Sequence, residues 1–319
     1  ASTPGKRGAM NRCKGSILFL FAMSMLISCQ REPVSDRCAT VFTAFQTPPA
    51  EMRSAPLWVW NTRVSKSDID DQLVDFRDHG LGGVFIHPRP GLITPYLSQE
   101  WLDLCTYTVA KGKELGMKVW IYDENSYPSG FAGGHVPAEM PGSLVKSLQM
   151  TNLKKLPDRL EQKPVLVLAA NANGFEDITD RWEQQDFGQG DFYLFNFKER
   201  NPSPWYGGFN YVDIMQREVT EKFISTTMEP YRAAFGEAFG NTVPGVFQDE
   251  AHIAPPGDNT CVQFTPKLFE AFAARWGYDL RLHLPSLFKD TGDWRQVRHN
   301  YYATLLELFI DNWAKPYAA

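Results

Sequence analysis

The sequence has little that suits a disulfide framework, a zinc site or a nucleic acid. Its 319 residues include 5 cysteines, and none of them has a CxxC or Cys/His spacing. Aspartate and glutamate (37) outnumber lysine and arginine (32), so the net charge of -5 gives no electrostatic reason to expect nucleic acid as a partner. With 43% hydrophobic and 22% charged residues, the composition is that of a globular protein.

A long apolar run is also lacking. The run at residues 17–27 is too short for a membrane-spanning helix, and the basic residues Arg12 and Lys14 before it are typical of an export signal. The run ends in Leu-Ile-Ser-Cys, which resembles the lipobox of bacterial lipoproteins and implies that Cys29 is lipidated. We therefore expect an exported protein, lipid-anchored to the bacterial cell envelope (periplasm or outer surface), that meets the membrane only through this anchor. The alternative is an ordinary signal peptide with an incidental cysteine.

The chain divides into three parts by composition. They are an export signal with the lipobox at residues 1–29, a polar, Pro-containing linker at 30–54 and a domain at 55–319. Residues 1–9, which precede Met10, have the character of a tag or a gene-start extension. In the domain, short apolar strands alternate with amphipathic helices. The expected strands are at 57–60, 83–86, 118–122 and 244–247.

Each expected strand is a continuous apolar run, which is typical of parallel strands buried on both faces. Helices are expected to begin near Ser67, Ser98, residue 216, Thr265-Pro266 and Trp294, and the first two to stop at Gly80 and Gly116.

Repeated βα units form either an open doubly wound sheet or a closed barrel. No Gly-rich phosphate loop follows the first strand, and polar residues end every strand, so we predict an α/β fold of the (β/α)8 TIM-barrel type. Four βα units cannot close eight strands, and the barrel is therefore expected to be incomplete. A β-rich insertion is expected after the third strand, at about 142–210, where β-prone pieces lie at 165–169 and 192–197.

The candidate site lies at the strand ends, which in a barrel converge on one polar bowl. These ends carry Asn61, His87 with Arg89, Asp123 with Glu124, and Asp249 with Glu250. Glycoside hydrolysis needs two carboxylates about 5 to 10 Å apart, and burial in a Trp-lined bowl raises the pKa of a carboxyl, which suits a general acid. Further candidates for substrate binding are Trp60, Asn125, Tyr127 and His252. The same residues could instead anchor the βα loops.

Asp249 and Glu250 are the catalytic candidates. Adjacent side chains on a strand point in opposite directions, so one acid can enter the bowl while the other braces a loop or ligand. We favour Glu250 as the acid in the bowl. A structural role as capping or salt-bridged groups, or a metal role, stays open for the pair.

Several segments together resemble glycoside hydrolase family 106. They are Trp58-Val59-Trp60-Asn61, the run Gly82 to His87, the Asp123-Glu124 turn with its Pro-Ser-Gly and Gly-Gly, Tyr211-Val212-Asp213, and the Asp249-Glu250 strand end. The resemblance runs from about residue 55 to the C-terminus. It implies an α-L-rhamnosidase barrel that inverts the anomeric centre with two glutamates and depends on calcium. By position, Glu250 matches the acid on the fourth strand, and the partner glutamate is expected beyond residue 319, which implies that this chain is inactive alone.

We therefore expect a glycoside hydrolase whose substrate is an oligosaccharide or polysaccharide. Two alternatives remain open. One is a non-catalytic sugar-binding lipoprotein that keeps the aromatic bowl without the second carboxylate. The other is a retaining glycosidase such as a β-galactosidase, which also uses an acid on the fourth strand and which product stereochemistry would separate.

Overall fold

The computed structural model describes residues 34–254 and 257–319, in two compact units divided after Pro49. The export signal, including Cys29, lies outside the described residues. In the first unit, helix α2 (Val34–Gln46) occupies most of the segment expected to be a linker. Among the described helices, none is long and apolar enough to cross a membrane.

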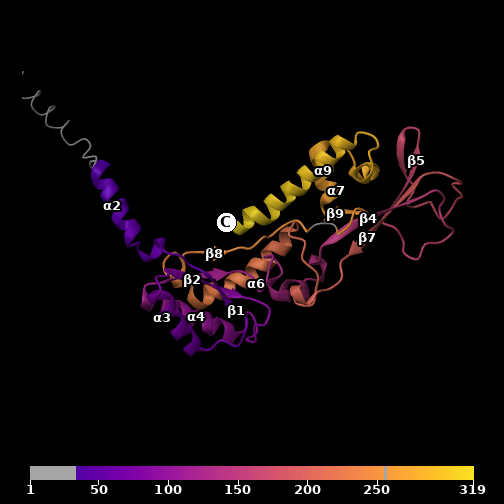
Figure 1. Cartoon of the computed structure of the whole chain (residues 1–319). Helices are drawn as coiled ribbons and strands as arrows, with labels where there is room; N and C mark the ends of the chain where they lie inside the picture. Colours follow the sequence, from indigo (N-terminus) through magenta and orange to yellow (C-terminus); the bar gives the residue numbers. More distant parts are fainter. Residues whose placement is uncertain (1–33, 255–256) are drawn as a thin grey trace, which may run out of the picture. The chain divides into compact units, whose positions relative to one another are not determined.

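The second unit opens with a four-stranded parallel sheet (Figure 1). Its strands, in the order β1-β2-β3-β8, are β1 (Leu57–Trp60), β2 (Gly83–Pro88), β3 (Lys118–Tyr122) and β8 (Val246–Phe247). All three pairings are parallel, and Tyr122 pairs with Phe247 at the end of the sheet. The four predicted strands are confirmed. Closure of the sheet into a barrel is not seen among the described residues.

Helices α3 (Lys66–Asp78), α4 (Gln99–Leu115) and α6 (Arg217–Phe235) follow or precede these strands as predicted. Ser98 caps α4 by accepting the N–H of Trp101, and Gly116 ends it with a φ of 67°. The expected cap of α3 at Ser67 is wrong. Ser65 is the N-cap, because its side chain accepts from the Asp68 N–H while the Asp68 carboxylate accepts from the Ser65 N–H.

The two faces of the parallel sheet differ. Trp58, Trp60, Val84, Ile86, Val119 and Ile121 face the helices and share one buried cluster with their apolar side chains. The alternate residues point to the other face, where Leu57 and Val59 are each 45% exposed and Phe85 stacks on Trp120 at 5.1 Å. One face is thus covered by helices, and the other is an open apolar surface.

A second, antiparallel sheet follows, in the order β6-β5-β7-β4-β9. Its strands are β4 (Lys146–Leu153), β5 (Leu166–Asn171), β6 (Gly174–Asp177), β7 (Phe192–Glu199) and β9 (Cys261–Phe264). The β-prone pieces at 165–169 and 192–197 correspond to β5 and β7. Strand β9 lies outside the expected insertion range, after β8, and pairs with β4.

The C-terminal helices pack on this sheet through a cluster that includes Phe195, Phe272 and Tyr301. They are α7 (Leu268–Trp276), η7 (Leu280–His283), α8 (Pro285–Phe288), α9 (Trp294–Phe309), the π-helix η8 (Ile310–Ala314) and α10 (Lys315–Ala318). The expected cap of α7 at Thr265-Pro266 is wrong, because the N-cap is Lys267 and makes no side-chain hydrogen bond.

Short helical turns complete the unit. They are η2 (Ala50–Met52), η3 (Ala132–Gly134), α5 (His135–Glu139), η4 (Pro141–Ser143), η5 (Pro204–Tyr206) and η6 (Gly236–Ala238).

Candidate functional site

The ends of β2, β3 and β8 bring together a cluster of polar and aromatic side chains. The Tyr122 hydroxyl donates a hydrogen bond to the Asp249 carboxylate, and the Arg89 guanidinium lies 3.9 Å from the same oxygen. Arg89 also lies over the Tyr127 ring, 4.9 Å from its centre. The Arg89 and Asp249 side chains are 22% and 18% exposed, so both are partly shielded and still reachable from solvent. We call Arg89, Tyr122, Tyr127 and Asp249, together with His87, the strand-end cluster.

His87 is the buried member of this cluster. Its ring stacks on the Tyr122 ring at 3.9 Å, and the side chain is 1% exposed. Neither ring nitrogen has a hydrogen-bond partner among the described residues. Burial lowers the pKa of His87 to about 4, and the Arg89 charge acts in the same direction. The imidazole is therefore neutral at pH 7 and keeps one donor and one acceptor unused.

Asp123 lies beneath the cluster and is fully buried. The Ser129 hydroxyl donates to one carboxylate oxygen at 2.6 Å, and the Tyr317 hydroxyl of α10 donates to the other at 2.7 Å. Burial raises the pKa of Asp123 to about 7, and the nearby Asp249 adds to this, while the two hydroxyl donors oppose it. This carboxyl connects β3 to the C-terminal helices and does not face solvent.

Glu124 holds the loop that follows β3. Its two oxygens accept hydrogen bonds from five backbone N–H groups, those of Asn125, Gly130, Phe131, Ala132 and Gly133. Gly133 has a φ of 62°, a conformation that favours glycine and lets the loop fold around the carboxylate. Burial raises the pKa of Glu124 above its usual range, whereas the backbone donors stabilise the ionised form and lower it. Because a proton on this carboxyl would meet only donors, we conclude that the loop holds a carboxylate. In this structure Glu124 therefore stabilises the loop after β3.

Asp249 and Glu250 both follow the end of β8 and have different environments, and the acid in the cluster is not the favoured Glu250. The structure places Asp249 in the strand-end cluster, whereas Glu250 is exposed and has a left-handed φ of 46°. The Glu250 side chain makes no hydrogen bond or ion pair within the described chain. His252 lies next to Glu250. The His252 ring stacks on Tyr211 at 5.5 Å, and its Nδ1 lies 2.7 Å from the Glu250 carbonyl oxygen.

The remaining predicted residues have different environments. Trp60 is 2% exposed and packs edge-on against Trp101, on the helix-covered face of the sheet and away from the cluster. Asn61 is exposed after β1. Asn125 is partly buried, and its side-chain oxygen has no hydrogen-bond partner among the described residues.

Sequence reasoning missed Trp205 as a neighbour of the cluster. Its ring packs edge-on against Tyr127 at 5.2 Å, and its indole N–H donates to the Tyr127 carbonyl oxygen. Trp205 is 37% exposed and belongs to η5, within the residues expected to form the insertion. Tyr127 and Trp205, whose rings are perpendicular at 87°, form an aromatic pair beside Arg89, which we call the aromatic wall.

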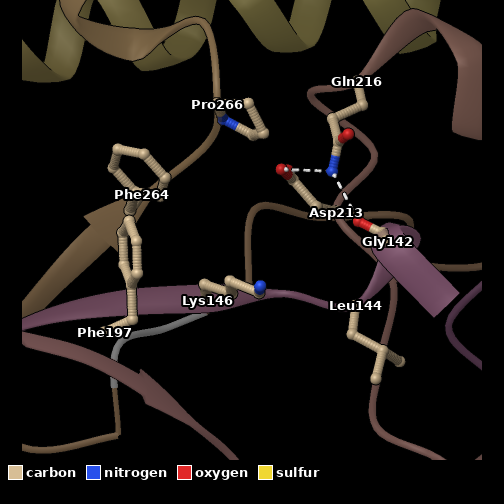
Figure 2. Close-up of a pocket in the computed structure, with 8 residues that line it drawn as sticks. All are labelled: Gly142, Leu144, Lys146, Phe197, Asp213, Gln216, Phe264 and Pro266. Carbon is tan, nitrogen blue, oxygen red and sulfur yellow. Dashed lines mark hydrogen bonds between the residues drawn. The ribbon is translucent and has the colours of Figure 1, made fainter. Parts of the chain in front are cut away.

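Figure 2 shows a separate pocket of about 330 Å³ beside the first residues of β4 and the end of β7. Phe197 and Phe264 form its apolar wall, with ring centres 4.8 Å apart. The Gln216 amide donates to the Asp213 carboxylate at 3.1 Å and to the Gly142 carbonyl oxygen at 3.4 Å. Burial raises the pKa of Asp213 to about 6. No residue of the strand-end cluster lines this pocket, so its shape does not bear on the chemistry there.

The family resemblance implies a dependence on calcium, and a calcium ion takes about six to eight oxygen ligands. Over residues 34–254 and 257–319, no group of three or more His, Cys, Asp or Glu side chains is placed to hold a metal ion. The carboxylates of Asp123 and Glu124 are already engaged by protein donors. The side chains of the described residues therefore do not form a calcium site, and we derive no step through the ion.

The fold of this chain is similar to that of a solved rhamnosidase structure. This rhamnosidase is from Novosphingobium sp. PP1Y, and the match has a TM-score of 0.56 and 13% sequence identity over 85% of this chain. The matched region is 45% of that rhamnosidase, so the chain spans less than half of its length. At this identity the likeness concerns the fold. No protein-family model matches the sequence, and no curated protein does.

Proposed function

We propose that this chain belongs to a glycoside hydrolase with a (β/α)8 barrel, which acts on an oligosaccharide or polysaccharide while lipid-anchored to the bacterial cell envelope. Parallel βα units whose strand ends carry acids support the barrel, since barrel enzymes place their active site there. The fold likeness to a rhamnosidase supports a sugar substrate. In its narrower form the proposal is an α-L-rhamnosidase-like, inverting enzyme of the family 106 type.

The observation that carries the proposal is the contrast between the two acids after β8. Tyr122 and Arg89 hold the Asp249 carboxylate in place. A carboxylate held in this way is suited to position a substrate, because it accepts hydrogen bonds from sugar hydroxyls. Glu250 is exposed, and among the described residues no partner engages its carboxyl group. We assign to Glu250, the acid that matches the family resemblance by position, the transfer of a proton to the leaving oxygen, and to Asp249 the positioning of the sugar. In the proposal, closure of the barrel around the strand ends supplies the burial that a general acid needs.

The open face of the parallel sheet supports the barrel. Parallel sheets are normally covered on both faces, whereas Leu57 and Val59 are each 45% exposed here. Further parallel strands, pairing with the edges of β1 and β8 at which no described strand lies, would close a barrel and cover this face. In the proposal, one of these strands supplies the second carboxylate that an inverting mechanism requires.

A second candidate is a non-catalytic sugar-binding lipoprotein. The aromatic wall of Tyr127 and Trp205 beside Arg89 favours it, because this surface can bind a sugar without any chemistry. Product analysis separates the candidates. The protein, expressed at its full natural length, would be incubated with nitrophenyl glycosides, including the α-L-rhamnoside, and the released sugar followed by NMR.

We expect β-L-rhamnose as the first product from the α-L-rhamnoside, because inversion places water on the opposite face of the ring. First release of the α-anomer would show a retaining enzyme. Binding of rhamnosides without hydrolysis of any glycoside would show the binding protein and overturn the hydrolase.

A further inference from the structure

A second concave surface lies among the antiparallel strands and C-terminal helices. It is a groove of about 900 Å³ between the β5–β6 hairpin, the start of β7 and the helices η7, α8 and α9. This volume is within the range of small-molecule binding sites. No residue of the strand-end cluster lines the groove. We propose that it binds a neutral oligosaccharide, and this inference does not depend on hydrolase activity at the strand ends.

The polar groups that line the groove both donate and accept hydrogen bonds. The hairpin contributes Asn171 and Asn173, and α9 contributes Gln296. The side chains of Asn173 and Gln296 are exposed and make no hydrogen bond within the described part of the chain. An amide offers N–H donors and a carbonyl acceptor, which matches a sugar hydroxyl, itself a donor and an acceptor. These amides are therefore available to a polyhydroxylated ligand.

Aromatic rings form the rigid part of the lining. Phe175 packs edge-on against Tyr193 at 5.4 Å, and the Lys289 ammonium lies 4.8 Å from the centre of the Tyr193 ring. On the other side, the Tyr278 hydroxyl accepts a hydrogen bond from the Asn300 amide at 3.1 Å. These contacts fix the rings before any ligand arrives, so binding does not have to order them. Tyr193 is buried and has Lys289 over its ring. The partly exposed rings of Phe175 and Tyr278 are therefore the ones that suit the C–H face of a sugar, beside amides that suit its hydroxyls.

The charges in the groove decide between neutral and anionic ligands. None of the described residues that line it is lysine or arginine, and the two ammonium groups beside it are already engaged, Lys154 by Asp191 and Lys289 by Asn152 and the Tyr193 ring. A phosphate, sulfate or uronate group would therefore find no uncommitted lysine or arginine there. Two carboxylates do line it. Asp191 is paired with Lys154 at 2.6 Å, whereas the Asp293 carboxylate has no ion-pair partner among the described residues. A carboxylate accepts from hydroxyls and repels anions, which favours a neutral sugar chain.

The test is isothermal titration calorimetry of the whole protein with cellohexaose, mannohexaose and xylohexaose, and with hexagalacturonate as the anionic comparison. At least one neutral hexasaccharide should bind and hexagalacturonate should not. The double variant Asn173→Ala/Gln296→Ala should raise the Kd about tenfold or more, because each lost hydrogen bond costs about a factor of five. Gln162→Ala, an exposed amide outside the groove, is the matched control and should leave the Kd unchanged.

Two further measurements locate the site. Asp249→Asn, in the strand-end cluster, should not change the Kd of the neutral hexasaccharide. The double variant should hydrolyse a nitrophenyl glycoside, which is too small to span both sites, as fast as the wild type. The inference is overturned if none of the neutral hexasaccharides binds at about millimolar concentration, if the double variant binds as tightly as the wild type, or if Asp249→Asn abolishes binding. A failure of hydrolysis alone would contradict the proposed enzyme and leave the groove result standing.

Discussion

The hydroxyl of Tyr122 donates a hydrogen bond to the carboxylate of Asp249 and so joins the ends of β3 and β8. Ser129 adds two further links, since its hydroxyl accepts the Asp249 N–H at 2.9 Å and its own N–H donates to the Asp249 carbonyl oxygen at 2.8 Å. Strand β8 has only two residues, so these contacts extend the attachment of its end beyond the strand itself. The position of Asp249 is thus fixed from both its side chain and its backbone.

Tyr122→Phe should destabilise the protein by about 1.5 to 3 kcal/mol, because it removes a hydrogen bond to a charged group. The ring should keep its stacking on His87, 3.9 Å away, so the loss reports the hydroxyl. Urea unfolding measures the change. Tyr302→Phe is the control, since Tyr302 is 64% exposed and should lose almost nothing. Equal stability of the two variants would show that the Tyr122 hydroxyl contributes little.

Asp123 predicts a pH dependence of stability. Burial raises its folded pKa to about 7, above the value of 3.8 expected for an unfolded carboxyl. Between these two values the folded state binds more protons than the unfolded state, so the contribution of Asp123 to stability falls as pH rises from about 4 to 7. Asp123→Asn cannot titrate. Its stability relative to the wild type should therefore increase over this interval, as measured by denaturant unfolding at pH 4.5 and 7.

Because other groups titrate in both proteins, only the difference between wild type and Asp123→Asn is interpreted. A difference that stays constant with pH would mean that the Asp123 pKa is not raised in the folded protein. A difference of the opposite sign would mean that the hydroxyls of Ser129 and Tyr317 hold the group ionised.

Glu124→Gln tests the structural role assigned to this residue. The amide NH2 of glutamine would face backbone N–H groups that now donate to a carboxylate oxygen, and these donors would lose their acceptor. We expect a loss of about 3 kcal/mol or more. Glu161→Gln, at an exposed position, provides the matched control and should keep wild-type stability. If Glu124→Gln melted like the wild type but lost substrate binding, Glu124 would be a ligand-binding residue.

The parallel strands were predictable because each is a continuous apolar run followed by a polar residue. The antiparallel sheet was only partly predictable. Strand β4 has the sequence KSLQMTNL, in which polar residues dilute the apolar pattern, and its partner β9 has only four residues. Leu148 pairs with Val262, more than a hundred residues later, and local sequence carries no signal for a pairing at that separation.

The candidate site was also only partly predictable from the sequence. Phe247 stacks on Tyr122 at 5.6 Å, and Asp249, two residues after the end of β8, accepts a hydrogen bond from the hydroxyl of the same tyrosine. Alternation therefore predicts that one of the two acids faces the cluster, but which one depends on the face that Phe247 takes in the sheet. Trp205 and Tyr317 reach the strand ends from distant segments, so only the tertiary fold shows their contacts.

The proposed anchor rests on Cys29, which follows the apolar run and the Leu-Ile-Ser sequence. Cells that express the protein and are fed an alkyne-labelled fatty acid should label the wild type. Cys29→Ala should remain unlabelled, because the thiol that accepts the lipid is gone. Cys13→Ala is the control, since this cysteine lies before the expected cleavage site. Equal labelling of Cys29→Ala and wild type would argue for an ordinary signal peptide.

Glu250→Gln should keep the fold, because the side chain is exposed and the amide is nearly the same size as the acid. In the protein expressed at its full natural length, it should lower kcat/KM on a rhamnose-containing oligosaccharide by about 10² to 10⁴, the usual contribution of general-acid catalysis. The kcat/KM on a nitrophenyl rhamnoside should fall by a much smaller factor. Nitrophenolate is a stable anion and departs with little help from a proton, whereas a sugar alkoxide does not.

Asp249→Asn is the matched variant for this experiment. If Asp249 positions the sugar, it should slow both substrates by a similar factor, because binding to the sugar ring does not depend on the leaving group. For each variant, the ratio of the loss in kcat/KM on the oligosaccharide to the loss on the nitrophenyl rhamnoside therefore separates the roles of the adjacent acids. Equal losses for Glu250→Gln on both substrates would argue for a binding role of Glu250. If instead Asp249→Asn showed the dependence on the leaving group and Glu250→Gln showed none, the general acid would be Asp249, with Tyr122 as the group that controls its proton.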